Sequence, residues 1–130
     1  MLKLKILLRV IGVVQIILGV LYLFTPEFIL KNMGHSIPET DIFYVFAMLA
    51  ARFITYGVAF IYISKEPLKY TLWIYFMIMI QIIDLSAGIY YTSINIVNIE
   101  LSAFPMFNAS LFIILLYIFT KQAKENLSAH

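Results

Sequence analysis

The chain contains no cysteine and few charged residues. Without cysteine it forms no disulfide, no thiolate metal site and no thiol redox centre. Its histidines are His35 and His130, and neither lies in an apolar stretch, which excludes a haem held by two histidines inside a membrane. Charged residues make up 12% of the chain, about half the share of an ordinary soluble domain. The formal net charge is only +2, so we expect no nucleic-acid partner.

Apolar residues, in contrast, make up 63% of the 130 residues, and the mean hydropathy is +0.96. Four apolar stretches are each long enough to cross about 30 Å of hydrocarbon as a helix. They run from Ile6 to Phe24, from Ile42 to Ile63, from Tyr70 to Tyr91 and from Leu101 to Thr120. We therefore predict an all-α integral membrane protein, with one transmembrane domain over residues 1–130 that forms an antiparallel four-helix bundle.

The distribution of lysine and arginine predicts how the spans are oriented. Seven of these residues lie at one end of the spans, and they are Lys3, Lys5, Arg9, Lys65, Lys69, Lys121 and Lys124. The other end has Lys31 alone, together with the acids Glu27, Glu39, Asp41 and Glu100. Because basic residues stay on the cytoplasmic side, we expect a multi-pass protein of the cell (inner) membrane with both termini in the cytoplasm. No small-residue cleavage pattern follows the first stretch, so we expect that helix to be retained.

Short motifs between the apolar stretches predict the connections. Thr25-Pro26-Glu27 is typical of a helix start, so a short helix is expected along Phe28 to Asn32, lying in the outer membrane interface. Ser36-Ile37-Pro38-Glu39 has the spacing of a capping box and predicts the start of the second long helix. Ser64-Lys65-Glu66-Pro67 predicts a tight inner turn, which makes the second and third spans an antiparallel hairpin.

Two opposite charges lie inside apolar stretches, Arg52 in the second and Asp84 in the third. A charge near the bilayer centre costs at least about 2.5–3.5 kcal/mol, so each needs a partner or a function. Since the second and third spans are predicted neighbours, we expect Arg52 to meet Asp84. Two interpretations remain open at this point. The pair either locks the hairpin as a structural ion pair or lines a functional cavity.

Other polar residues recur at helical spacing and place a polar face on each span. In the third span, Gln81 and Asp84 share a face with Gly88. Because polar faces avoid lipid, we expect these faces to meet inside the bundle. The candidate ligand-binding residues are Arg52, Asp84, Gln81, Asn108, Gln15 and Tyr56. Gln15, Gln81 and Asn108 are equally typical of hydrogen bonds between helices, while Gly12 and Gly19 are expected to be packing residues.

Several short motifs follow one another over most of the chain. A first helix with glycines is followed by Pro26-Glu27-Phe28 and by Met33-Gly34, then by Ala50-Ala51-Arg52-Phe53 with Gly57, and finally by an acid in the third span. In this order the features resemble the DoxX-like family of small four-helix bacterial membrane proteins. The resemblance implies a four-helix membrane fold. Many members of that family have no assigned activity, and some are membrane subunits linked to thiosulfate–quinone oxidoreduction.

The sequence favours a binding protein over an enzyme. Asp84 is the only acid within a span, and no Ser–His or His–Asp arrangement exists, so no catalytic residue, metal ligand or cofactor is predicted. We expect a polar intramembrane site that binds a lipid-like or quinone-like small molecule, or an accessory membrane subunit. The alternatives are an ion or small-solute transporter that works as an oligomer, and a structural subunit with a purely structural Arg52–Asp84 pair. Expected partners are membrane lipids, a hydrophobic small molecule, and further copies or a larger membrane complex.

Overall fold

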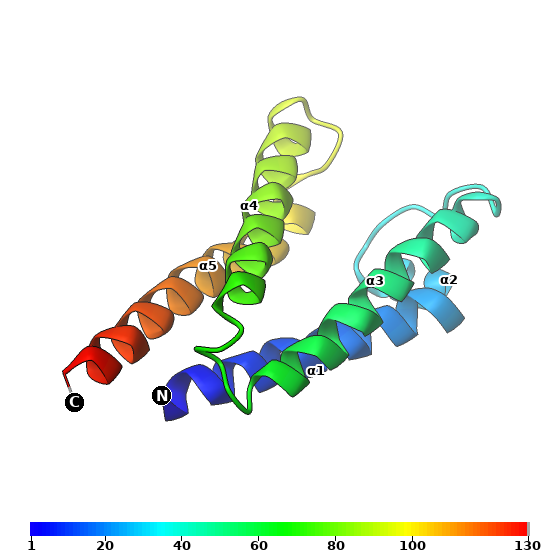
Figure 1. Ribbon diagram of the computed structural model, residues 1–130. Helices are drawn as coiled ribbons and strands as arrows, with labels where there is room; N and C mark the ends of the chain where they lie inside the picture. Colours follow the sequence, from blue (N-terminus) through cyan, green and yellow to red (C-terminus); the bar gives the residue numbers. More distant parts are fainter. Residues whose placement is uncertain (130) are drawn as a thin grey trace. The chain divides into compact units, whose positions relative to one another are not determined.

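The computed structural model describes residues 1–129, and the regular structure of these residues is entirely helical (Figure 1). Its helices are α1 (Leu2–Phe24), α2 (Pro26–Asn32), α3 (Ile42–Ile63), α4 (Thr71–Ser93) and α5 (Ile99–Ser128). All except α2 are long and apolar enough to cross a membrane. The prediction of an all-α membrane protein with four spans and a short helix after the first span is therefore confirmed.

The chain divides into two compact units, and each is described by itself. One unit, which we call the N-terminal hairpin, covers Leu8–Lys65 and contains most of α1 together with α2 and α3. The other, which we call the C-terminal hairpin, contains α4 and α5 together with Met1–Leu7. Helix α1 is continuous, so its first residues belong to one unit and the remainder to the other.

In the N-terminal hairpin, α1 and α3 approach each other so closely that their backbones touch (Figure 1). A Cβ atom added to Gly57 would lie 2.6 Å from the carbonyl oxygen of Gly12, and one added to Gly19 would lie 3.0 Å from the carbonyl oxygen of Ala50. The small residues are two turns apart in each helix, Gly12 and Gly19 in α1 and Ala50 and Gly57 in α3. Their contacts therefore form one line between two antiparallel helices, which we call the glycine seam. Small residues permit such an approach, which confirms Gly12 and Gly19 as packing residues.

In the C-terminal hairpin, α4 and α5 run antiparallel and contact each other along their length (Figure 1). Near the start of α4, the Lys124 ammonium donates a hydrogen bond of 3.0 Å to the Tyr75 hydroxyl. Near its end, the Thr92 hydroxyl donates a hydrogen bond of 2.7 Å to the Ser102 hydroxyl. The connection between the helices contains Asn95 in the left-handed conformation, with φ 58°.

Helices α1 and α5 are longer than the apolar stretches that predicted them. Helix α3 has the predicted bounds, but α1 begins earlier, at Leu2, and α5 continues beyond Thr120 as far as Ser128. The additional part of α5 is polar and contains an ion pair between Lys121 and Glu125, one turn apart, at 4.0 Å. Apolar composition therefore marks the part of a helix suited to lipid, whereas the hydrogen-bonded helix can continue into water.

The predicted capping box before α3 is wrong. Residues 35–39 have no regular structure, and α3 begins at Ile42. Successive turns lead into the helix, since the Ile42 N–H donates to the Glu39 carbonyl and the Phe43 N–H donates to the Thr40 carbonyl. These backbone N–H groups are thus satisfied without a side-chain cap. Thr25 does precede α2 as predicted, but its hydroxyl donates to the Leu21 carbonyl at 3.0 Å and caps nothing.

The glycine seam yields a stability prediction. We expect Gly57→Ala to lower the free energy of unfolding by about 1–3 kcal/mol, because the new methyl group would overlap backbone atoms of α1 that cannot move independently. Gly88→Ala is the matched control, since its methyl group would meet only the flexible side chain of Met106. We expect the control to cost less than about 1 kcal/mol. Unfolding by SDS titration in mixed micelles measures both, and equal losses would contradict the seam.

Candidate functional site

Arg52 lies at the middle of α3 with an exposed side chain. Its Nη1 donates a hydrogen bond of 2.7 Å to the Met48 carbonyl, one turn earlier in the same helix. The acids of the N-terminal hairpin are Glu27, Glu39 and Asp41, and all of them precede α3. Among the described residues of this hairpin, the guanidinium therefore has no carboxylate partner.

Asp84 lies near the middle of α4, and its side chain is also exposed. The basic residues of the C-terminal hairpin lie far from the α4–α5 connection, near the other end of the helices. They are Lys3, Lys5, Lys69, Lys121 and Lys124. None of the described residues in this hairpin forms an ion pair or a hydrogen bond with the Asp84 carboxylate. Each hairpin thus carries one intramembrane charge that it does not neutralise. An Arg52–Asp84 ion pair would link a residue of one unit to a residue of the other, and so would the packing of α3 against α4. Both therefore stay predictions.

The remaining candidate residues are divided between the hairpins. Gln15 is buried in α1, with 7% of its surface exposed, and no described residue hydrogen bonds to its amide. Gln81 is buried in α4, with 5% exposed, and its Nε2 donates to the Met77 sulfur at 3.4 Å. A thioether is a weak acceptor, so this amide is only partly satisfied. Tyr56 on α3 and Asn108 on α5 are half-buried.

Within each hairpin these residues lie at a similar level. In the N-terminal hairpin, Gly12 lies opposite Gly57 and Gly19 opposite Ala50, so Gln15 lies level with the residues between Arg52 and Tyr56. In the C-terminal hairpin, the side chain of Met106 faces Gly88. Asn108 then lies level with the part of α4 that follows Asp84. The structure therefore brings Gln15 level with Arg52 and Tyr56 in one hairpin, and Asn108 close to the level of Asp84 in the other.

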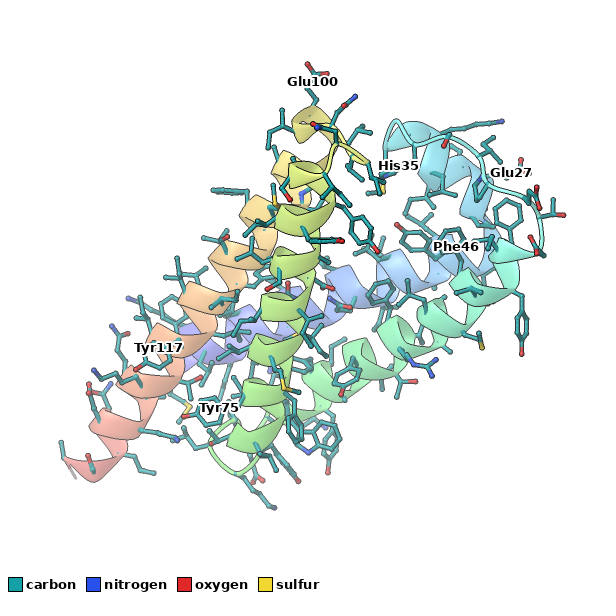
Figure 2. The ribbon with its side chains drawn as sticks, turned by 90° about the horizontal axis from the view of Figure 1, so that it is seen from above. Glu27, His35, Phe46, Tyr75, Glu100 and Tyr117 are labelled. Carbon is teal, nitrogen blue, oxygen red and sulfur yellow. The ribbon has the colours of Figure 1, made fainter. Side chains whose placement is uncertain are left out.

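Sequence reasoning missed an aromatic cluster near the α1–α2 junction. The ring of Tyr22 lies 5.7 Å from that of Phe46 and 6.1 Å from that of Phe53, and Phe43 lies 6.4 Å from Phe46. The Tyr22 hydroxyl also contacts the Met33 sulfur at 3.7 Å, just after α2. Phe46 is labelled in Figure 2. The spacing of the three phenylalanines along one face of α3 was the available signal.

A polar contact at the opposite end of the N-terminal hairpin was also missed. The Arg9 Nε donates a hydrogen bond of 3.2 Å to the hydroxyl of Ser64, which is fully buried just after α3. The Ser64 hydroxyl in turn donates to the Ile61 carbonyl at 2.7 Å. Arg9 therefore connects α1 to the end of α3. No sequence motif marks this contact, because it depends on how the two helices cross.

Comparison with known protein families, with curated proteins and with solved structures finds no match to this chain. Within residues 1–129, no three His, Cys, Asp or Glu side chains come together in a way that could hold a metal ion. Among the candidate residues, the N-terminal hairpin carries a guanidinium, an amide and a phenol, and the C-terminal hairpin carries a carboxylate and two amides.

The weak contact of Gln81 yields a second prediction. We expect Gln81→Leu to leave the free energy of unfolding within about 1 kcal/mol of the wild type, because it removes only an amide–sulfur contact and adds apolar surface to a buried position. Thr92→Val provides the contrast, since it removes a short hydroxyl–hydroxyl bond between helices and is expected to cost about 0.6–1 kcal/mol. A larger loss for Gln81→Leu than for Thr92→Val would show that the amide has a stronger structural partner.

Proposed function

We propose that this integral membrane protein binds a lipid-like or quinone-like small molecule at a polar intramembrane site centred on Arg52 and Asp84. The proposal rests chiefly on one observation, that each hairpin carries a single unneutralised charge near the middle of a spanning helix, and that the two charges have opposite sign. Two such helices in one membrane have a strong reason to associate, because pairing lowers the cost of both charges.

The levels of the two charges support their pairing. Arg52 lies at the centre of α3, which spans Ile42–Ile63. The centre of α4, which spans Thr71–Ser93, is Ile82, so Asp84 lies two residues beyond it. At about 1.5 Å per residue, this places the carboxylate about 3 Å from the centre of its helix. A long arginine side chain can bridge that difference, and a guanidinium and a carboxylate form strong paired hydrogen bonds.

Two buried amides favour a bound molecule in addition to the ion pair. Gln15 has no hydrogen-bond partner among the described residues, and Gln81 contacts only a sulfur atom. No amide atom of either residue is both completely buried and without a partner, so these amides can still hydrogen bond a carbonyl or hydroxyl group of a ligand, at about 0.5–1.5 kcal/mol for each bond. The flexible side chain of Met77, buried beside Gln81, can adapt to an apolar ligand body.

The arrangement of basic residues supports a cytoplasmic location of both termini, and the order of motifs supports a relationship to the DoxX-like family. Both remain part of this proposal. A structural subunit that uses the same ion pair without a ligand is the main alternative. A transporter would instead require Asp84 to exchange a proton, which a neighbouring guanidinium opposes because it favours the ionised carboxylate.

Charge reversal tests the pair. We expect Arg52→Asp and Asp84→Arg each to lower the free energy of unfolding by about 3 kcal/mol, because each brings two like charges together inside the membrane. The double variant restores the pair and should recover at least half of the loss. The exposed pair Glu66–Lys69, at 3.2 Å, is the matched control, and its reversal should change stability by less than about 0.5 kcal/mol. If the double variant loses as much free energy of unfolding as the two single variants together, Arg52 and Asp84 do not form an ion pair.

A ligand test separates binding from a structural role. We expect a short-tailed benzoquinone, or a phospholipid added to delipidated protein, to raise the melting temperature. A ligand concentration of about a hundred times the dissociation constant raises the free energy of unfolding by about 2.7 kcal/mol. Gln81→Leu should reduce this gain at least fivefold without changing the melting temperature of the ligand-free protein. Stabilisation of equal size in the wild type and in Gln81→Leu would contradict the site, and no stabilisation by either probe would favour the structural subunit.

A further inference from the structure

A groove of about 540 Å³ lies at the corner where α1 turns into α2, next to the start of α3. It is separate from the polar residues of the proposed site. Its lining residues are Phe24, Thr25, Pro26, Glu27, Phe28, Lys31 and Phe43. Glu27 is labelled in Figure 2. The groove therefore combines three aromatic rings with one carboxylate and one ammonium group.

The two charged groups of the groove are not paired with each other. Glu27 and Lys31 lie one helical turn apart on α2, which is the spacing at which a glutamate and a following lysine usually interact. Both side chains are exposed, and among the described residues neither takes part in an ion pair or a side-chain hydrogen bond. Four residues of helix correspond to about 6 Å, so the groove offers separate positions for a negative and a positive ligand group.

The position and the residues of α2 suit a groove at the membrane surface. Helix α2 follows the first span directly, and its Ile29 and Leu30 are buried, with 6% and 7% of their surfaces exposed. The rings of Phe24 and Phe28, by contrast, are 73% and 61% exposed. Exposed aromatic rings next to charged residues at the end of a span are typical of the interface between headgroups and acyl chains.

We propose that this groove binds the headgroup of a zwitterionic phospholipid. The Lys31 ammonium contacts the lipid phosphate, and the Glu27 carboxylate contacts the positively charged amine at the end of the headgroup. Phe24, Phe28 and Phe43 supply aromatic faces, which attract an amine cation and contact the beginning of the acyl chains. The two opposite charges of the headgroup are thus each complementary to one charged residue of α2. This inference does not depend on the Arg52–Asp84 site.

Lipid retention by the full-length protein tests the proposal. The purified chain is incubated with equimolar phosphatidylethanolamine, phosphatidylcholine and phosphatidylglycerol, and the bound lipids are counted by native mass spectrometry. We expect at least a fivefold preference for either zwitterionic lipid over the anionic phosphatidylglycerol. A preference for ethanolamine would indicate that hydrogen bonds from a primary amine to Glu27 dominate. A preference for choline would indicate that the aromatic faces dominate, and either outcome supports the proposal.

Two variants assign the roles of the charges. Lys31→Glu should reduce the retention of all three lipids at least fivefold, because the phosphate loses its cation. Glu27→Gln should remove the preference, so that phosphatidylglycerol is retained as strongly as the zwitterionic lipids. Glu39→Gln and Lys121→Gln are matched controls, since both residues are exposed and lie outside the groove, and both variants should behave as the wild type. Equal retention of anionic and zwitterionic lipids by the wild type, or unchanged retention in Lys31→Glu and Glu27→Gln, would overturn the proposal.

Discussion

The structure depends on one constraint, which is that hydrocarbon offers no hydrogen-bond partner to a polar group. The four long helices satisfy their backbones internally, and several polar side chains in them do the same by bonding to their own helix. The hydroxyls of Thr55, Ser86 and Ser110 each donate to the carbonyl four residues earlier, at 2.7–2.9 Å. Arg52 likewise donates a hydrogen bond from its Nη1 to the Met48 carbonyl, four residues earlier. A guanidinium has five N–H donors, however, so a single carbonyl leaves most of its capacity unused.

Under the same constraint, spans associate through close packing more than through the hydrophobic effect. The two hairpins achieve this differently. In the N-terminal hairpin, glycines bring two backbones into contact, so the fit depends on the absence of side chains. In the C-terminal hairpin, Gly88 receives the side chain of Met106, and the Thr92–Ser102 bond fixes the end near the connection. The first arrangement leaves no room for a larger side chain, whereas a flexible methionine side chain fills the space at the glycine of the second.

Much of the architecture was predictable because length and apolarity alone identify a span. The bounds of α3 were predicted correctly, and α5 was underestimated because its last turns are polar. Gly12 and Gly19 were recognised as packing residues, but their partners Ala50 and Gly57 required the crossing of α1 and α3 to be known. The prediction of a capping box before α3 was wrong because backbone carbonyls of short-range turns accept the N–H groups that a side-chain cap would have bound. For the candidate site, the sequence identified the charged and amide residues, whereas the partial satisfaction of Gln81 became visible only in three dimensions.

The division of α1 between the two units has a consequence for folding. Met1–Leu7 belong to the same unit as α5, and Met1, Leu2, Lys3 and Leu4 line a shallow groove together with Phe119, Gln122 and Asn126. Segments far apart in the sequence are therefore neighbours in this unit. Contacts of such long range close a large loop of chain and form slowly. Membrane insertion can proceed span by span, but the contact between the beginning of α1 and the last turns of α5 requires both helices to be present.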